Sequence, residues 1–129
     1  MLKLFIKNFY VLKSQAKNKI ISIVIPTFNE QNNISRIIDQ LLKIDINYVM
    51  EIIVVDDNSI DGTAALVRDF SRIDRRVRLI IRMGRSGLSS AIKEGCLCAS
   101  GEVIAVMDAD GQHDPCLLYT SPSPRDPHL

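Results

Sequence analysis

The sequence has little excess charge, few cysteines and no long apolar run. Its 129 residues carry a formal net charge of only +1, so bulk charge does not indicate nucleic acid as a partner. The 3 cysteines form neither a CxxC pair nor an even disulfide set, which favours a reducing, cytoplasmic setting. No apolar run approaches the roughly 20 residues that a membrane-spanning helix needs. With 47% apolar residues, the chain can still bury the core of one domain.

Residues 1–19 differ from the rest of the chain, because they contain five lysines, no acidic residue, and apolar residues interleaved with the cations. The segment lacks the continuous apolar stretch and the small-residue cleavage site of a signal peptide. Two interpretations remain open. One is a packed or frayed basic extension with solvated lysines, and the other is a basic amphipathic helix that makes a peripheral contact with an anionic membrane surface.

Four short, partly β-branched apolar runs predict buried strands, and the amphipathic segments between them predict helices. Pro26 should end the first strand because it has no N–H to donate to a sheet ladder. Asp61 is expected to be the N-cap of the second helix. Alternating strands and helices with short joins predict an α/β domain with a mostly parallel sheet. The expected strands are 20–25, 51–55, 77–81 and 103–107, and the expected helices are 33–43, one that begins after Asp61, and 88–98.

Four loops leave the carboxyl ends of these strands, at 26–30, 56–63, 82–87 and 108–114. In open α/β sheets, ligands bind outside the carboxyl ends of the strands, near the point where the strand order reverses. One edge of the sheet therefore carries acidic, amide, basic and aromatic groups, and we expect the functional site there.

The loop after the last strand carries three oxygen-bearing side chains at alternate positions, Asp108, Asp110 and Gln112. On a turning backbone these can converge on one divalent cation, and hard oxygen ligands suit Mg²⁺ or Mn²⁺. Such a cation would in turn bind a diphosphate. A plain polar turn is the alternative for this loop.

The other two charged loops also allow two interpretations. Asp56 and Asp57 can form a polar turn that caps the next helix, or they can face a ligand. Arg82 and Arg85 can be solvated loop charges, or they can form a phosphate site, since a Gly-flanked basic loop precedes a helix N-terminus here.

These loops belong to four segments: IPTFNE (25–30), VVDDNSIDGT (54–63), RMGRSGLSSAIKEG (82–95) and VMDADGQHDP (106–115). As a set, in this order, the segments resemble the family 2 inverting glycosyltransferases, in particular the dolichyl-phosphate mannose and glucose synthase branch. The resemblance covers about residues 20–115. It implies a Rossmann-like glycosyltransferase fold of the A type, truncated here, with helices on both faces of the sheet and with 20–115 as the nucleotide-sugar-binding part.

The resemblance implies that the first two loops bind the nucleoside. Pro26, Phe28 and Glu30 match positions that contact it. Asp57 matches the residue that accepts a hydrogen bond from the base, and Asp56 matches one that shapes the same loop.

For the other two loops, the resemblance implies contacts with phosphate and metal. Arg85 matches a basic position that contacts phosphate or acceptor, and Arg82 would help to bind the nucleotide. Asp108, Asp110 and Gln112 match the metal ligands of the DxD type. The two aspartates and Arg85 would thus be the catalytic residues, because they neutralise charge on the leaving group.

The implied reaction is metal-dependent transfer of a hexose from a GDP- or UDP-linked sugar, with inversion, to an acceptor. A polyprenyl phosphate acceptor is already an anion, so the reaction needs no strong general base. The implied place of action is the cytoplasm, at the cytoplasmic face of a membrane.

After Pro115 the sequence CLLYTSPSPRDPHL has no periodicity, and it predicts neither a helix nor a strand. It does not resemble the family, so we expect 116–129 to be a non-native tail and the chain to hold the donor half without the acceptor half. Such a fragment should be inactive alone. Two other classes remain as alternatives: a nucleotide- or metal-binding α/β module without turnover, and a receiver-like domain. The second fits less well, because receivers carry their acidic pair after the first strand.

Overall fold

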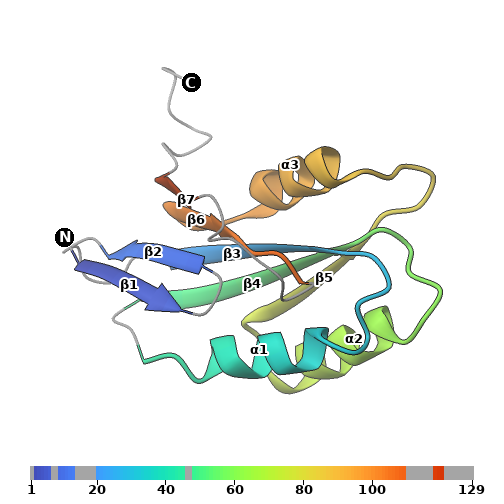
Figure 1. Ribbon diagram of the computed structural model, residues 1–129, viewed down its shortest axis with the longest axis horizontal. Coiled ribbons are helices and arrows are strands. Elements are labelled where there is room, and N and C mark those ends of the chain that lie inside the picture. The colour runs from blue at the N-terminus through green and yellow to red at the C-terminus, as the bar shows by residue number, and fades with distance from the viewer. Residues whose placement is uncertain (1, 7–8, 14–19, 46–47, 110–117, 121–129) are drawn as a thin grey trace.

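The protein folds as a layered α/β domain (Figure 1). The computed structural model describes residues 2–6, 9–13, 20–45, 48–109 and 118–120. The larger sheet contains β3 (Ile20–Thr27), β4 (Val49–Asp56), β5 (Val77–Ile81), β6 (Val103–Val106) and β7 (Leu118–Thr120), and the helices are α1 (Ile34–Leu42), α2 (Thr63–Ile73) and α3 (Leu88–Cys98). The predicted α/β class and the predicted sites of the three helices are confirmed.

The strand order of this sheet is β5-β4-β3-β6-β7. Strands β3 to β6 pair in parallel, and β7 pairs antiparallel with β6. The chain steps outward from β3 to β5 and then returns to the other side of β3 to form β6. The strand order therefore reverses between β3 and β6, and the carboxyl ends of these two strands form the crevice where such sheets bind ligands.

Helices cover both faces of the sheet, as expected (Figure 1). Alternate residues of a strand point to opposite faces. Ile23 and Ile25 of β3 therefore pack in the core beneath α1 and α2, whereas Val24 packs beneath α3. The sequences of these strands are continuous apolar runs because both faces of the sheet are buried.

Pro26 lies inside β3, opposite Val55, so the prediction that it ends the strand is wrong. In a strand that has a parallel neighbour on each side, successive residues form backbone hydrogen bonds with one neighbouring strand and then with the other. The Val24 carbonyl accepts a hydrogen bond from Met107 on the β6 side, and the Thr27 carbonyl accepts one from Asp57 on the β4 side. The backbone of Pro26 faces the β6 side, as that of Val24 does, but Pro26 lies beyond the last residue pair of β3 and β6. The missing N–H of Pro26 therefore removes no hydrogen bond between strands.

Asp61 stands one residue before the observed N-cap, Gly62, so the predicted cap position is wrong by one. Its carboxylate nevertheless accepts a hydrogen bond from the Thr63 N–H at 3.0 Å. The acidic side chain thus still satisfies a backbone N–H at the start of α2.

The N-terminal segment contains a hairpin, in which β1 (Leu2–Ile6) pairs antiparallel with β2 (Phe9–Lys13). The amphipathic helix that we considered for 1–19 is therefore wrong for these residues, whereas a peripheral membrane contact of this segment stays a prediction. None of the described helices reaches the length and hydrophobicity that a bilayer crossing requires.

The expectation that no strand follows Pro115 is also wrong, because Leu118–Thr120 forms β7 along the edge of β6. Edge strands are held largely by backbone hydrogen bonds, which need no alternating sequence pattern. The remainder of the expected tail, 116–117 and 121–129, lies outside the described residues.

Near the amino ends of the strands, Glu51 of β4 joins three neighbouring segments. Its carboxylate accepts hydrogen bonds from Ser22 Oγ of β3 at 2.7 Å and from Arg78 Nη1 of β5 at 2.5 Å. It also accepts one from the Ser100 N–H, just before β6, at 2.9 Å. Burial raises the pKa of Glu51, but the hydrogen bonds from Ser100, Ser22 and Arg78 outweigh it and lower the pKa below its ordinary value of 4.5.

Glu51→Gln should lower the free energy of unfolding by about 2 kcal/mol at pH 7, since it weakens hydrogen bonds to a partly buried charge. The folded-state pKa is depressed, so the contribution of the carboxylate is full above pH 4.5 and is lost as the pH falls through the folded-state value. Urea titrations at several pH values should therefore show the two curves converging in acid. Asp69→Asn, at an exposed ion pair with Arg72, is the matched control and should change stability by less than about 0.5 kcal/mol. A constant difference down to pH 2 would contradict the assignment.

Gly95 lets α3 approach the sheet closely. A Cβ at this position would lie 2.4 Å from Val24 Cγ1 and 3.0 Å from Val55 Cγ2, and β-branched side chains have few other rotamers to adopt. Close packing therefore requires glycine here, although glycine weakens a helix.

Gly95→Ala tests this requirement. Helix propensity alone would stabilise the protein by about 1 kcal/mol, but overpacking costs about 1–3 kcal/mol, so we expect a net loss of about 1 kcal/mol. Ser89→Ala, at an exposed position of α3, should be neutral or slightly stabilising. A higher urea midpoint for Gly95→Ala than for the wild type would refute the close approach.

Candidate functional site

A cavity of about 190 Å³ opens at the carboxyl edge of the sheet, at the reversal of strand order. Pro26, Phe28 and Glu30 line it from the end of β3 and the loop that follows. Asp57 lines it from the end of β4, and Asp108 from the end of β6. The start of α3 forms the remaining wall through Leu88 and Ala91. The structure thus brings together five of the predicted site residues from three loops.

The loops after β3 and β4 are tied to each other by hydrogen bonds. Asn29 has a φ of 52°, in the left-handed region that asparagine tolerates. Its N–H donates to Ser59 Oγ at 2.8 Å, and its Oδ1 accepts from the Ile60 N–H at 3.1 Å. The Glu30 N–H donates to Thr63 Oγ1 at 2.9 Å. These bonds hold Phe28 and Glu30, on either side of Asn29, against the β4 loop.

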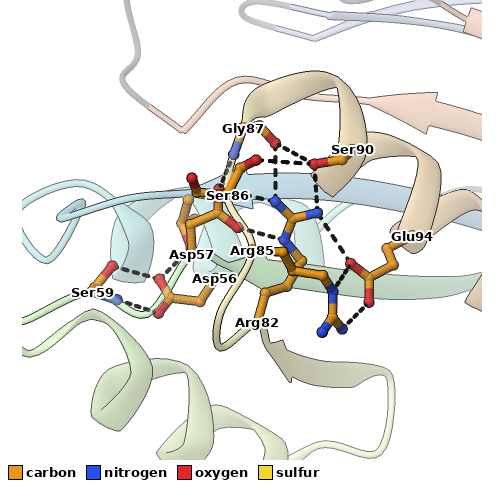
Figure 2. A network of polar contacts seen from close by, with 10 residues as sticks. Asp56, Asp57, Ser59, Arg82, Arg85, Ser86, Gly87, Ser90 and Glu94 are labelled. Atoms are coloured by element: carbon orange, nitrogen blue, oxygen red, sulfur yellow. Dashed lines mark hydrogen bonds and ion pairs between the residues drawn. The ribbon is translucent and has the colours of Figure 1, made fainter.

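Asp56 is fully buried and organises the turn after β4. Its carboxylate accepts a hydrogen bond from Thr27 Oγ1 at 2.7 Å. It also accepts hydrogen bonds from the Ser59 N–H and Oγ at 2.9 and 2.6 Å (Figure 2). Both oxygens are occupied by protein groups and the side chain has no exposed surface. The Asp56 carboxylate is thus committed to protein groups, and its role in shaping a nucleotide-binding loop stays a prediction.

Asp57 is held by the loop between β5 and α3. Its Oδ1 accepts a hydrogen bond from Arg82 Nε at 2.6 Å, and its Oδ2 accepts from Arg82 Nη2 at 3.4 Å and from the Gly87 N–H at 3.0 Å (Figure 2). The residue is half-buried and faces the cavity. Its carboxylate is therefore oriented by the protein before any ligand arrives.

Arg82 lies beneath the site, with no exposed surface. Besides the two bonds to Asp57, Nη1 donates to Ser90 Oγ at 2.8 Å and to Glu94 Oε2 at 3.1 Å, and Nη2 donates to the Gly87 carbonyl at 3.2 Å. A guanidinium has about five N–H donors, so none remains for a ligand. The hydrogen bond to Asp57 raises the pKa of Arg82, burial opposes that rise, and the bond to Glu94 adds to it. Direct binding of a nucleotide by Arg82, as the resemblance implied, would require one of these bonds to break.

Arg85 does not line the cavity either. Its Nε and Nη2 donate to the two oxygens of Glu94 at 3.0 and 2.5 Å, and 56% of its side chain is exposed. The hydrogen bond from Arg85 is the main cause that lowers the pKa of Glu94 to about 2, against desolvation and with help from Arg82. Glu94 is thus ionised at neutral pH, and the role of Arg85 at phosphate stays a prediction.

Sequence reasoning missed Glu94. It lies in the same quoted segment as Arg82 and Arg85, but 12 and 9 residues after them, which is not a spacing that indicates a pair on one helix. The contact arises only in the folded chain, where the loop between β5 and α3 brings both arginines beside Glu94 of α3.

Of the three predicted metal ligands, Asp108 is described and lines the cavity, whereas Asp110 and Gln112 lie outside the described residues. Within the described part of the chain, no group of three or more His, Cys, Asp or Glu side chains could hold a metal ion. The exposed carboxylate of Asp108 at the end of β6 is a hard oxygen donor, which fits the ligand chemistry of Mg²⁺ and Mn²⁺.

Comparison with protein families identifies one matching model, Glycosyl transferase family 2, over residues 22–120. The match includes all four loops of the carboxyl edge. It also includes residues 116–120, beyond the last of the four segments quoted above.

Two curated relatives carry the names of dolichyl-phosphate enzymes. The chain is 44% identical over 98 residues to a dolichol-phosphate mannosyltransferase of Pyrococcus furiosus, covering 74% of this chain and 27% of the relative. It is 32% identical over 108 residues to a dolichyl-phosphate beta-glucosyltransferase of Dictyostelium discoideum, covering 77% of this chain and 33% of the relative. The chain thus spans about a third or less of the length of these relatives.

Solved structures show the same fold. A mannosyltransferase from Pyrobaculum calidifontis, in complex with GDP-Man and Mn²⁺, superposes with a TM-score of 0.63 at 28% identity, over 74% of this chain and 28% of that one. Glucosyl-3-phosphoglycerate synthase from Mycobacterium tuberculosis gives a TM-score of 0.59 at 24% identity, over 70% of this chain and 33% of that one, which is a likeness of fold alone. With the family match over most of its length and a parallel sheet whose site lies at the reversal of strand order, the chain belongs to glycosyl transferase family 2 and has the A-type glycosyltransferase fold.

Proposed function

We propose that this chain is the donor-binding part of a glycosyltransferase that moves a hexose from a nucleoside diphosphate sugar to a polyprenyl phosphate with inversion. The observation that carries the proposal is the cavity at the carboxyl edge, where Phe28, Asp57 and Asp108 converge from three strands. Phe28 offers an apolar ring, whereas Asp57 and Asp108 offer carboxylates, and together they suit the base and the diphosphate of one ligand.

The nucleoside would bind between the loops after β3 and β4. Phe28 is 61% exposed and lines the cavity, so it offers a ring for stacking or apolar contact. The Asp57 carboxylate already accepts three hydrogen bonds and keeps capacity for about one more, enough for a base N–H. Pro26 and Glu30 complete this wall.

The diphosphate would lie toward Asp108 on the other side of the reversal point. Asp110 and Gln112 would join Asp108 in holding Mg²⁺ or Mn²⁺, and when bound this cation neutralises charge on the leaving diphosphate. The two solved structures compared above are complexes with Mn²⁺ and with GDP-Man or UDP, which supports the same ligand class here. The Arg85 guanidinium, in the loop that precedes α3, is a candidate for a further phosphate contact, because 56% of its side chain is exposed.

The acceptor class is inferred from the names of the relatives, both of which are dolichyl-phosphate enzymes. A phosphate monoester is an anion at neutral pH and attacks without a strong general base. Because the chain spans a third or less of these relatives, we expect it to bind the donor but not to complete the transfer alone.

Isothermal titration of the full chain with GDP and UDP, each with and without Mn²⁺, tests the proposal. Binding should require the metal, and Asp108→Asn combined with Asp110→Asn should weaken it by about 10-fold or more. The matched control combines Asp39→Asn with Asp69→Asn, two exposed helical carboxylates, and should bind like the wild type. A folded chain that binds neither nucleotide would refute the donor site. Binding that needs no metal and is unchanged by both pairs of substitutions would favour a nucleotide-binding module without glycosyl transfer.

A further inference from the structure

Four side chains of alternating charge form a continuous chain from the surface to the cavity. Arg85 pairs with Glu94, Glu94 pairs with Arg82, and Arg82 pairs with Asp57, as Figure 2 shows. The shortest N–O distances of these pairs are 2.5, 3.1 and 2.6 Å. Two cations and two anions balance, so the buried guanidinium in the middle is fully compensated.

The Arg82 guanidinium is held from two sides. Its Nε and Nη2 engage Asp57, while its Nη1 engages Glu94 and Ser90 on α3. A planar guanidinium that is bound along one edge only can still tilt about that edge, whereas contacts on both sides fix its plane. Within the described residues, Glu94 is the only charged group that contacts Arg82 from the α3 side.

The orientation of Asp57 depends in turn on Arg82. Two of the three hydrogen bonds that its carboxylate accepts come from Arg82, and the third comes from the Gly87 N–H, whose own carbonyl Arg82 also binds. Asp57 faces the cavity, whereas Glu94 and Arg82 do not line it. A change at Glu94 can therefore reach the cavity through Arg82 and Asp57.

We propose that Glu94 is a positioning residue of the nucleoside subsite, which sets the orientation of the Asp57 carboxylate through the buried Arg82 guanidinium. The inference rests on the proposed function, because it concerns the same donor site. Arg85 takes part in this arrangement because it neutralises Glu94 from the solvent side. If Arg85 moves to bind a phosphate, Glu94 still has Arg82 as its partner.

The test uses ligands with and without phosphates. Glu94→Gln removes the charge at constant shape, and we expect it to weaken the binding of the free nucleosides guanosine or uridine by about 5-fold. The binding of the matching diphosphate with Mn²⁺ should weaken by the same factor, because the loss arises at the base. In an Asp57→Asn background, Glu94→Gln should have no further effect on nucleoside affinity. Glu102→Gln, an exposed glutamate outside the chain of charges, is the control and should leave both affinities unchanged.

Several outcomes would overturn the inference. A wild type that binds nucleoside, with a Glu94→Gln variant of equal affinity and lower melting temperature, would show a purely structural role. A loss confined to the diphosphate would show that Glu94 acts on phosphate through Arg85. A wild type that binds neither ligand would refute the proposed function together with this inference. If Glu94→Gln does not fold, Glu94→Asp, which keeps the charge but is one methylene shorter, takes its place with the same expectation of equal losses.

Discussion

The parallel pairing of β3 with strands on both of its sides is the constraint on which the rest of this structure depends. β4 pairs along all eight residues of β3, from Ile20 to Thr27, and β6 pairs with four of them. Because all these strands run the same way, their carboxyl ends meet at one edge, and the reversal of strand order opens a crevice there. Phe28, Asp57 and Asp108 come from distant parts of the chain and share a cavity for this reason.

The charges at this edge show two different uses. Asp108 is exposed and lines the cavity, whereas Asp56 and Arg82 are buried and make their hydrogen bonds within the protein. A buried ion pair gains little net stability, because desolvation offsets most of the attraction. The buried charges here fix the loops after β4 and β5 in one geometry, and that geometry orients the half-buried Asp57.

The regular elements could be predicted because their signals are local. The strand 77–81 and the helix 88–98 were predicted at the observed bounds, since apolar runs and helical spacing are short-range patterns. The prediction for Pro26 was wrong because the energetic cost of a proline in a strand depends on whether a neighbouring strand would bond to its N–H. No local sequence pattern shows this. The paired strands β1 and β2, and β7, escaped prediction for a similar reason: these strands are defined by backbone pairing with a partner.

The sequence by itself determined the fold class, the family and the loops that form the site, because apolar periodicity and motif spacing are written along the chain. Only the tertiary structure decided which residues of those loops reach a ligand. Arg82 and Arg85 are alike in sequence, yet Arg82 is buried with its donors occupied and Arg85 is mostly exposed. The pairing of both with Glu94 depends on how the loop between β5 and α3 folds, and burial and hydrogen-bond partners are properties of that fold rather than of the residues.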